Sequence, residues 1–113
     1  MGASERRKGV RGEQEVARLL GAFGLPVQRV VNQSGVVMRG DLTGVPGLHF
    51  EVKRQEVLRL PSWLRQVERD VAGTANMPVL VFRTSSSGPV GDWHAVVRLR
   101  DLARILALKA GEG

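Results

Sequence analysis

The sequence predicts one mixed α/β domain in which helices flank a single β-sheet. The chain has 113 residues, which is the length of one domain. Stretches with helical periodicity alternate with short β-branched runs, and no internal repeat or long linker divides the chain. The expected element order is α-β-β-β-α-β-β-α with about five strands. We expect residues 1–8 to form a flexible basic arm and residues 110–113 to form a tail.

Each element is predicted from a local pattern. Helices are placed where apolar residues recur every three or four positions, and strands where alternating or β-branched runs lie between turn residues. The predicted helices span residues 12–23, 61–72 and 100–110. The predicted strands span residues 27–31, 41–45, 48–53, 78–83 and 93–99. Gly24 ends the first helix, Pro61 begins the second, and Pro46-Gly47 joins two strands as a hairpin.

Composition excludes several classes of protein. Cysteine is absent, which excludes a disulfide scaffold, thiolate catalysis and a cysteine zinc site. With only two histidines, a histidine-rich metal cage is also excluded. No apolar run approaches the roughly 18–20 residues of a membrane span, and the basic N-terminus lacks the apolar region of a signal peptide. We expect a soluble cytoplasmic protein with no membrane partner and no small-molecule cofactor.

The charge balance indicates a polyanionic partner. Lys and Arg total 17 against 11 Asp and Glu, which gives a net charge of +6 and an isoelectric point near 11.3. Such a basic domain is typical of nucleic-acid binding. Arginine is the main cation, and its planar guanidinium suits phosphate recognition, although a GC-rich genome produces the same bias. The charge therefore indicates a partner and not a reaction.

Two carboxylates and a lysine are expected to meet on one strand face. Glu51 and Lys53 are two residues apart, so their side chains point to the same side, and the hairpin brings Asp41 close. Adjacent carboxylates raise each other's pKa unless a cation lies between them. Mg²⁺ takes oxygen ligands, and Lys53 would stabilise the attacking hydroxide or the phosphate. The alternative is a solvated face with salt bridges, on which His49 is expected to be an exposed strand residue.

A third carboxylate is predicted to point inward. Glu13 lies three residues before Val16 and seven before Leu20, on the apolar face of the first helix. Burying a carboxylate without a partner is costly, and a metal site shared with Asp41 and Glu51 would supply one. The alternative is a helix N-terminal residue stabilised by the helix dipole.

Cationic residues flank all three of these carboxylates along the chain. They are Arg6, Arg7, Lys8, Arg11, Arg39 and Arg54. An acidic pocket with such neighbours suits a metal-dependent phosphodiesterase, because cations bind the nucleic-acid backbone while carboxylates hold the metal.

Taken together, these segments resemble the PD-(D/E)XK nuclease core, through Gly40-Asp41 and Glu51-Val52-Lys53. Over about residues 7–106 the chain also resembles archaeal-type Holliday-junction resolvases and their phage-encoded relatives. The remaining segments that carry this resemblance are Arg7-Lys8-Gly9, Glu13-x-Glu15-Val16, Leu19-Leu20, Val27-Gln28-Arg29, Ser34-Gly35, Val52 to Glu56 with Trp63 and Gln66, and Pro78 to Arg83.

The resemblance implies a restriction-endonuclease-like fold and an Mg²⁺-dependent endonuclease that cuts branched DNA as a two-fold dimer, with Mn²⁺ also supporting activity, in a bacterial host or phage-infected cell. The implied metal ligands are Glu13, Asp41, Glu51 and the Val52 carbonyl. Lys53 would be the catalytic lysine, Arg29 and Ser34 would engage the scissile strand, and Gln66 would lie near the site. Gln14 stands where the archaeal enzymes usually carry arginine, which puts the junction preference in doubt.

The last predicted helix suggests how two copies meet. Its apolar stripe consists of Leu99, Leu102, Ile105 and Leu106, and Leu108 lies off the stripe. Apolar residues on more than one helix face are often buried in a subunit contact, and packing of Leu108 against the sheet is the alternative. We expect a homodimeric endonuclease that resolves Holliday junctions. The alternatives are a nuclease of the same core that cuts other branched or duplex DNA, and a non-catalytic DNA-binding protein that retains the fold.

Overall fold

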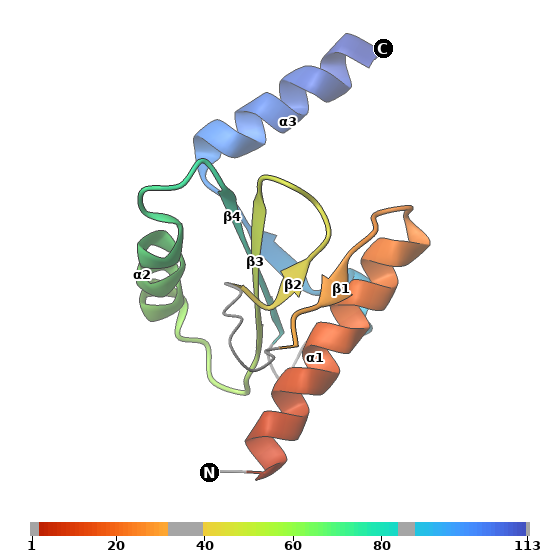
Figure 1. Ribbon diagram of the computed structural model, residues 1–113, viewed down its shortest axis with the longest axis vertical. Coiled ribbons are helices and arrows are strands. Elements are labelled where there is room, and N and C mark those ends of the chain that lie inside the picture. Colours follow the sequence, from red (N-terminus) through yellow and green to blue (C-terminus); the bar gives the residue numbers. More distant parts are fainter. Residues whose placement is uncertain (1–2, 32–39, 84–87, 113) are drawn as a thin grey trace.

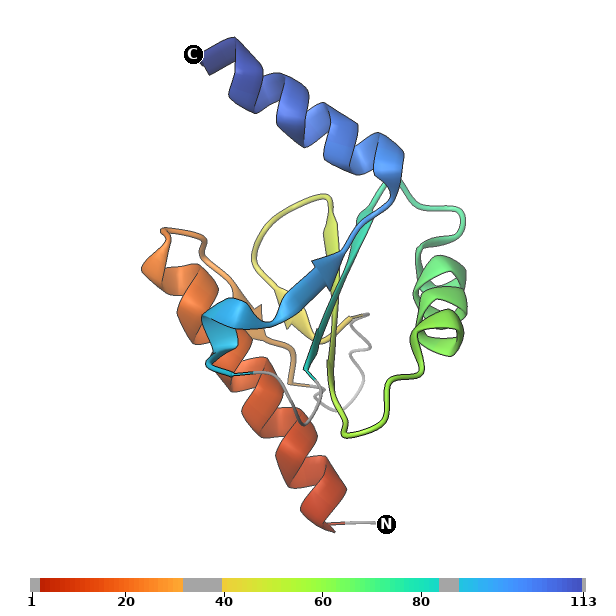
Figure 2. The same ribbon diagram turned by 180° about the vertical axis from the view of Figure 1, so that it is seen from behind.

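A computed structural model describes residues 3–31, 40–83 and 88–112. In this part of the chain, helix α1 (Ala3–Ala22) covers one face of a five-stranded sheet, and helix α2 (Leu60–Val71) covers the other (Figure 1). Helix α3 (Leu99–Glu112) extends away from one end of the sheet, as the opposite view also shows (Figure 2). The predicted α/β class and element order are confirmed, with a short 3₁₀ helix η1 (Val90–Asp92) added before the last strand.

The strands lie in the sheet in the order in which they occur along the chain. They are β1 (Gln28–Arg29), β2 (Leu42–Thr43), β3 (Leu48–Arg54), β4 (Met77–Arg83) and β5 (His94–Val96). Strands β3 and β4 are parallel and connected through α2, whereas the other pairs are antiparallel. The central pair matches its predicted bounds closely. The outer strands are shorter than predicted because they pair over only two or three residues.

The main apolar core lies between α1 and the sheet. Val16 of α1 packs with Phe50 and Val52, which alternate along β3 and therefore share one face. On the opposite face, α2 contributes the buried side chains of Trp63 and Val67. Strand β3 is thus covered on both faces, so its polar residues are enclosed along with its apolar ones.

Helix α1 begins earlier than the pattern predicts. Its first residue is Ala3, so residues 3–8 of the predicted arm form helical turns. Gly12, at the predicted start, lies inside the helix, where an added Cβ would come within 3.0 Å of the Arg54 Cβ. This glycine permits close packing of α1 on β3 and does not mark a helix end. No helix in the described ranges is long and apolar enough to cross a bilayer.

Three of the predicted DNA contacts cannot be placed. Ser34 and Arg39 lie outside the described residues, together with most of the predicted loop at 32–40. Arg6 belongs to α1, but its side chain is also outside the described part of the chain.

Candidate active site

Asp41 lies immediately before β2, and both its backbone and its side chain bind β3. Its N–H donates to the Phe50 carbonyl at 2.7 Å, and its Oδ2 accepts the Val52 N–H at 2.7 Å. The carboxylate thereby satisfies a strand N–H that β2 does not reach. The N–H and C=O of a strand residue point toward the same neighbour. The Val52 carbonyl therefore lies on the edge of β3 that faces Asp41.

Gly40 allows the chain to approach β3 at this position. Its φ is +83°, in the left-handed region where glycine is favoured. An added Cβ would lie 3.0 Å from the Phe50 carbonyl oxygen and 3.4 Å from the His49 ring. A larger residue would therefore meet both backbone strain and crowding, and would displace Asp41.

The three predicted carboxylates form a row with Asp41 in the middle. The pKa of Glu51 is raised to about 8, first by burial and then by the charge and hydrogen-bonding contact of Asp41, against the opposing effect of Lys53. Burial also raises the pKa of Glu13, again with Asp41 adding to the increase, while a 2.9 Å bond from Arg29 Nε to Glu13 opposes it. The cations of the protein therefore compensate these carboxylates only in part.

Lys53 lies on the same face of β3 as Glu51, as the spacing predicts. Its Nζ donates to Gln66 Oε1 of α2 at 3.1 Å. The amide thus fixes the ammonium group beside the carboxylates without neutralising its charge.

These side chains line one cleft of about 720 Å³. The predicted site residues that border it are Lys8, Glu13, Asp41, Glu51, Val52, Lys53, Arg54 and Gln66. Arg59, which the sequence did not single out, lines the cleft as well. Arg7 and Arg11 are exposed on the opposite face of α1, where they line a separate hollow with Gln14. The cleft therefore combines an acidic floor with cationic residues at its border.

Several of the predicted DNA contacts have partners within the protein. Arg29 binds Glu13, and Lys8 Nζ lies 3.2 Å from Glu56 Oε1. Arg54 packs against Gly12 with its Nε 4.0 Å from Glu15. Of these cations, Lys8 is the most exposed, with 44% of its side chain accessible.

His49 contradicts the expectation of an exposed strand residue. Only 4% of its surface is accessible, because α2 covers its face of β3. Its Nε2 lies 3.2 Å from Glu51 Oε1 and 3.9 Å from Asp70 Oδ2. Asp70 was not predicted from the sequence. Its position one helical turn after Gln66 was the available signal, because residues four apart share a helix face.

Among the described residues, one group of three His, Asp and Glu side chains has all its ligand atoms within 4.8 Å of one another. It consists of His49, Glu51 and Asp70. Glu13 and Asp41 are not part of this group. Glu51 thus stands between two sets of polar side chains, with Asp41 on one side and the His49–Asp70 pair on the other.

Comparison with known families places this geometry in context. Residues 4–109 match the model of a family described as "Phage putative PDDEXK endonuclease". Searches against curated proteins and against solved structures each returned no match. The match covers nearly all of the chain, including Asp41, Glu51 and Lys53, and confirms the predicted superfamily. The chain therefore belongs to this phage family of PD-(D/E)XK endonucleases.

Proposed function

We propose that this nuclease is a metal-dependent endonuclease that hydrolyses phosphodiester bonds in branched DNA, with the four-way junction as its preferred substrate. One observation carries the proposal. The Val52 N–H donates a hydrogen bond to the Asp41 carboxylate, which places Asp41 against β3. Asp41 thereby shares one cleft with Glu51 and Lys53.

The donor atoms at this point suit a hard divalent cation. Asp41 and Glu51 offer carboxylate oxygens, and the Val52 carbonyl faces the same position. Mg²⁺ prefers such oxygen ligands and retains waters, and Mn²⁺ accepts them too. Burial, and after it the neighbouring charge of Asp41, raise the pKa of Glu51, and a cation bound between these carboxylates would favour their charged forms. Glu13, bound to Arg29, would complete the row. A bound cation would lower the pKa of a water and neutralise charge on the phosphate.

The protein groups then have separate tasks. In hydrolysis a water adds its oxygen to phosphorus, one P–O ester bond breaks, and the departing oxygen gains a proton. We assign to Lys53 the stabilisation of negative charge that develops on the phosphate or on the attacking oxygen. Gln66 holds the ammonium group in position through its 3.1 Å bond.

The cationic border of the cleft supports a nucleic-acid substrate. Lys8, Arg54 and Arg59 line it, and Arg7 and Arg11 add positive charge on the outer face of α1. Contacts of this kind bind phosphates without reading sequence. The resemblance to Holliday-junction resolvases favours a branched substrate over a linear duplex.

We also propose that the enzyme acts as a homodimer joined through α3. This helix leaves the sheet (Figure 1). Its stripe residues Leu99 and Leu106 are 80% and 57% exposed, and Leu108, off the stripe, is 73% exposed. The alternative of Leu108 packing on the sheet does not account for this exposure. A second copy that packs the same stripe in return would bury Leu99 and Leu106 by two-fold symmetry. Two sites related by a dyad suit paired cuts in a junction of matching symmetry.

The experiment compares cleavage of a synthetic four-way junction, a flap and a linear duplex of related sequence, in Mg²⁺, in Mn²⁺ and in EDTA. We expect cleavage that requires the metal and is fastest on the junction. Lys53→Ala should lower the rate by about 10²–10³-fold with junction binding retained, whereas Arg69→Ala, at an exposed position on α2 outside the cleft, should cut normally. Binding without cleavage by the unaltered protein would contradict the enzyme assignment. Equal cleavage of all three substrates would contradict only the junction preference.

A further inference from the structure

We propose that His49, Glu51 and Asp70 form a second site, which binds a divalent first-row transition-metal ion through one imidazole nitrogen and two carboxylates. Glu51 would then belong to two sites, with Asp41 on one side of its carboxylate and this ion on the other. The proposal rests on the geometry of the three side chains and not on nuclease activity, although the site borders the proposed nuclease centre.

The separations of the ligand atoms suit one ion. His49 Nε2 lies 3.2 Å from Glu51 Oε1 and 3.9 Å from Asp70 Oδ2, and all three ligand atoms lie within 4.8 Å of one another. Ligands about 2.1 Å from a metal ion are about 3.0–3.4 Å apart at octahedral or tetrahedral angles, and about 4.2 Å apart when they are opposite. Small shifts would therefore bring all three ligand atoms to bonding distance.

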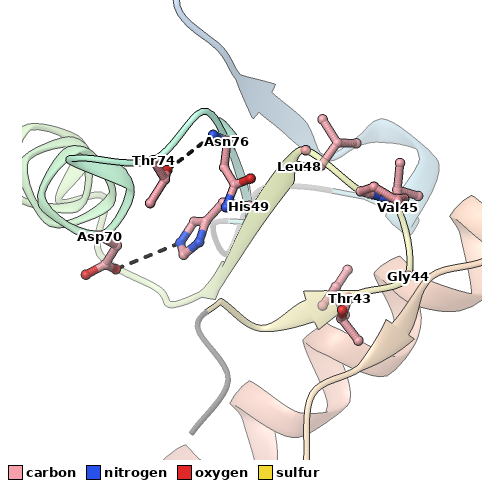
Figure 3. A pocket seen from close by; sticks show the side chains of 11 residues that line it. Thr43, Gly44, Val45, Leu48, His49, Asp70, Thr74 and Asn76 are labelled. Carbon is pink, nitrogen blue, oxygen red and sulfur yellow. Dashed lines mark hydrogen bonds and ion pairs between the residues drawn. The ribbon is translucent and has the colours of Figure 1, made fainter.

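The elements that carry these ligands hold them in place. His49 and Glu51 alternate on β3, which is paired on both sides, and their side chains are 3% and 9% exposed. Asp70 comes from α2, and its carboxylate points toward the imidazole (Figure 3). An ion here would join α2 to the central strand of the sheet.

The local charge also favours a cation. After burial, the negative charges of Asp41 and Asp70 both raise the pKa of Glu51, and the positive charge of Lys53 lowers it. The Lys53 ammonium group is itself hydrogen-bonded to Gln66. Two carboxylates around a buried imidazole present the negative charge that a divalent ion would neutralise.

A pocket gives access to this site from the side. It has a volume of about 540 Å³ and is lined by His49, Asp70, Thr74 and Asn76 together with the β2–β3 connection (Figure 3). The proposed nuclease cleft includes Glu51 but neither His49 nor Asp70. An ion can therefore reach the imidazole without passing through the DNA-binding cleft.

The donor set also indicates which ion would bind. Imidazole favours transition metals such as Co²⁺, Ni²⁺ and Zn²⁺, whereas Mg²⁺ prefers oxygen ligands alone. The oxygen-lined nuclease centre and this mixed site should therefore differ in their preferred metal.

Co²⁺ provides the test, because it reports its ligands through paramagnetically shifted proton signals. The chain has only two histidines, so a shifted imidazole N–H signal can be assigned by substitution. Co²⁺ is titrated into the full-length protein in excess Mg²⁺, and its binding is followed by proton NMR and calorimetry. We expect one tight Co²⁺ site with a shifted imidazole N–H.

His49→Gln should abolish this signal and weaken Co²⁺ binding about tenfold to hundredfold, whereas His94→Gln, which removes the exposed histidine on β5, should leave both unchanged. Asp70→Asn should weaken binding similarly and provides the test if His49→Gln fails to fold. Asp41→Asn should retain the imidazole signal, which separates this site from the nuclease centre. A shifted signal that persists in His49→Gln, or no tight Co²⁺ site in the unaltered protein, would overturn the proposal and leave His49 with a structural role.

Discussion

Asp41 shows how one side chain links the fold to the site. Its carboxylate accepts a hydrogen bond from the Val52 N–H, which β2 does not reach, and also lies beside Glu13 and Glu51. The two-residue spacing of Glu51 and Lys53 was enough to predict their common face, because side-chain alternation along a strand is a local property. The burial of His49 was not predictable in this way, since it depends on the helix that covers this face.

The metal-free protein should become less stable as the pH rises. The pKa of Glu51 is raised to about 8 in the folded state from an ordinary value of 4.5. Between these values the folded protein binds more protons than the unfolded chain, so stability falls as the pH rises from about 4.5 to 8. Glu51→Gln should therefore raise the free energy of unfolding at pH 8 by about 1–3 kcal/mol, after allowance for solvent screening.

Thermal unfolding in EDTA between pH 5 and 8 measures this effect. The unfolding temperature of the Glu51→Gln protein should vary less with pH than that of the unaltered protein. Some pH dependence should remain because the pKa of Glu13 is also raised. Glu112→Gln, at an exposed position on α3, is the matched control and should follow the unaltered protein. Identical pH dependence in all three proteins would show that Glu51 is an ordinary carboxylate.

Gln66 should act through Lys53 and not on the substrate directly. Removing its amide in Gln66→Ala frees the ammonium group that it holds at 3.1 Å. We expect cleavage to fall about tenfold, and the double variant with Lys53→Ala to be no slower than Lys53→Ala alone, because the two groups share one task. Single-turnover rates measure this coupling, with Gln28→Ala on exposed β1 as the control. Additive losses would assign Gln66 a separate role.

At the level of helices and strands, local patterns located the elements better than their ends. Strand β3 matches the predicted segment closely because alternation and a glycine turn define it. Helix α1 was predicted nine residues too short, beginning at residue 12 and not at Ala3. Gly12 suggested a boundary, but tertiary contact with Arg54 explains that glycine. Local propensity does not distinguish a glycine that ends a helix from one that allows close packing.

The exposed cationic face of α1 should contribute affinity that does not depend on DNA sequence. Arg7 and Arg11 lie on this face. The Arg7→Ala/Arg11→Ala variant should reduce the slope of log affinity against log salt by roughly one unit for each phosphate that the protein no longer binds. Fluorescence anisotropy with a labelled junction measures the slope, and Arg69→Ala, at an exposed position on α2, serves as the control. An unchanged slope would mean that these arginines do not bind phosphate.

For the molecule as a whole, the exposed stripe of α3 is the feature that bears most on assembly. Charge placed on this stripe should separate the subunits if it forms the dimer interface. We expect Leu102→Glu/Leu106→Glu to sediment as a monomer where the unaltered protein sediments as a dimer, with unchanged helix content by circular dichroism. The monomer should also lose paired cutting of a junction while retaining single nicks. A dimer that persists in this variant would place the interface elsewhere.

The amino-acid order alone was sufficient to predict the α/β class, the succession of elements and the acidic residues with Lys53 beside them. Each of these follows from composition, periodicity or short spacing. The packing of α2 across β3 established the remaining features, namely the burial of His49, the contribution of Asp70 and the two-sided surroundings of Glu51. These features depend on contacts between residues that are distant in sequence. Whether a polar side chain becomes buried depends on the element that covers it, and no local pattern specifies that element.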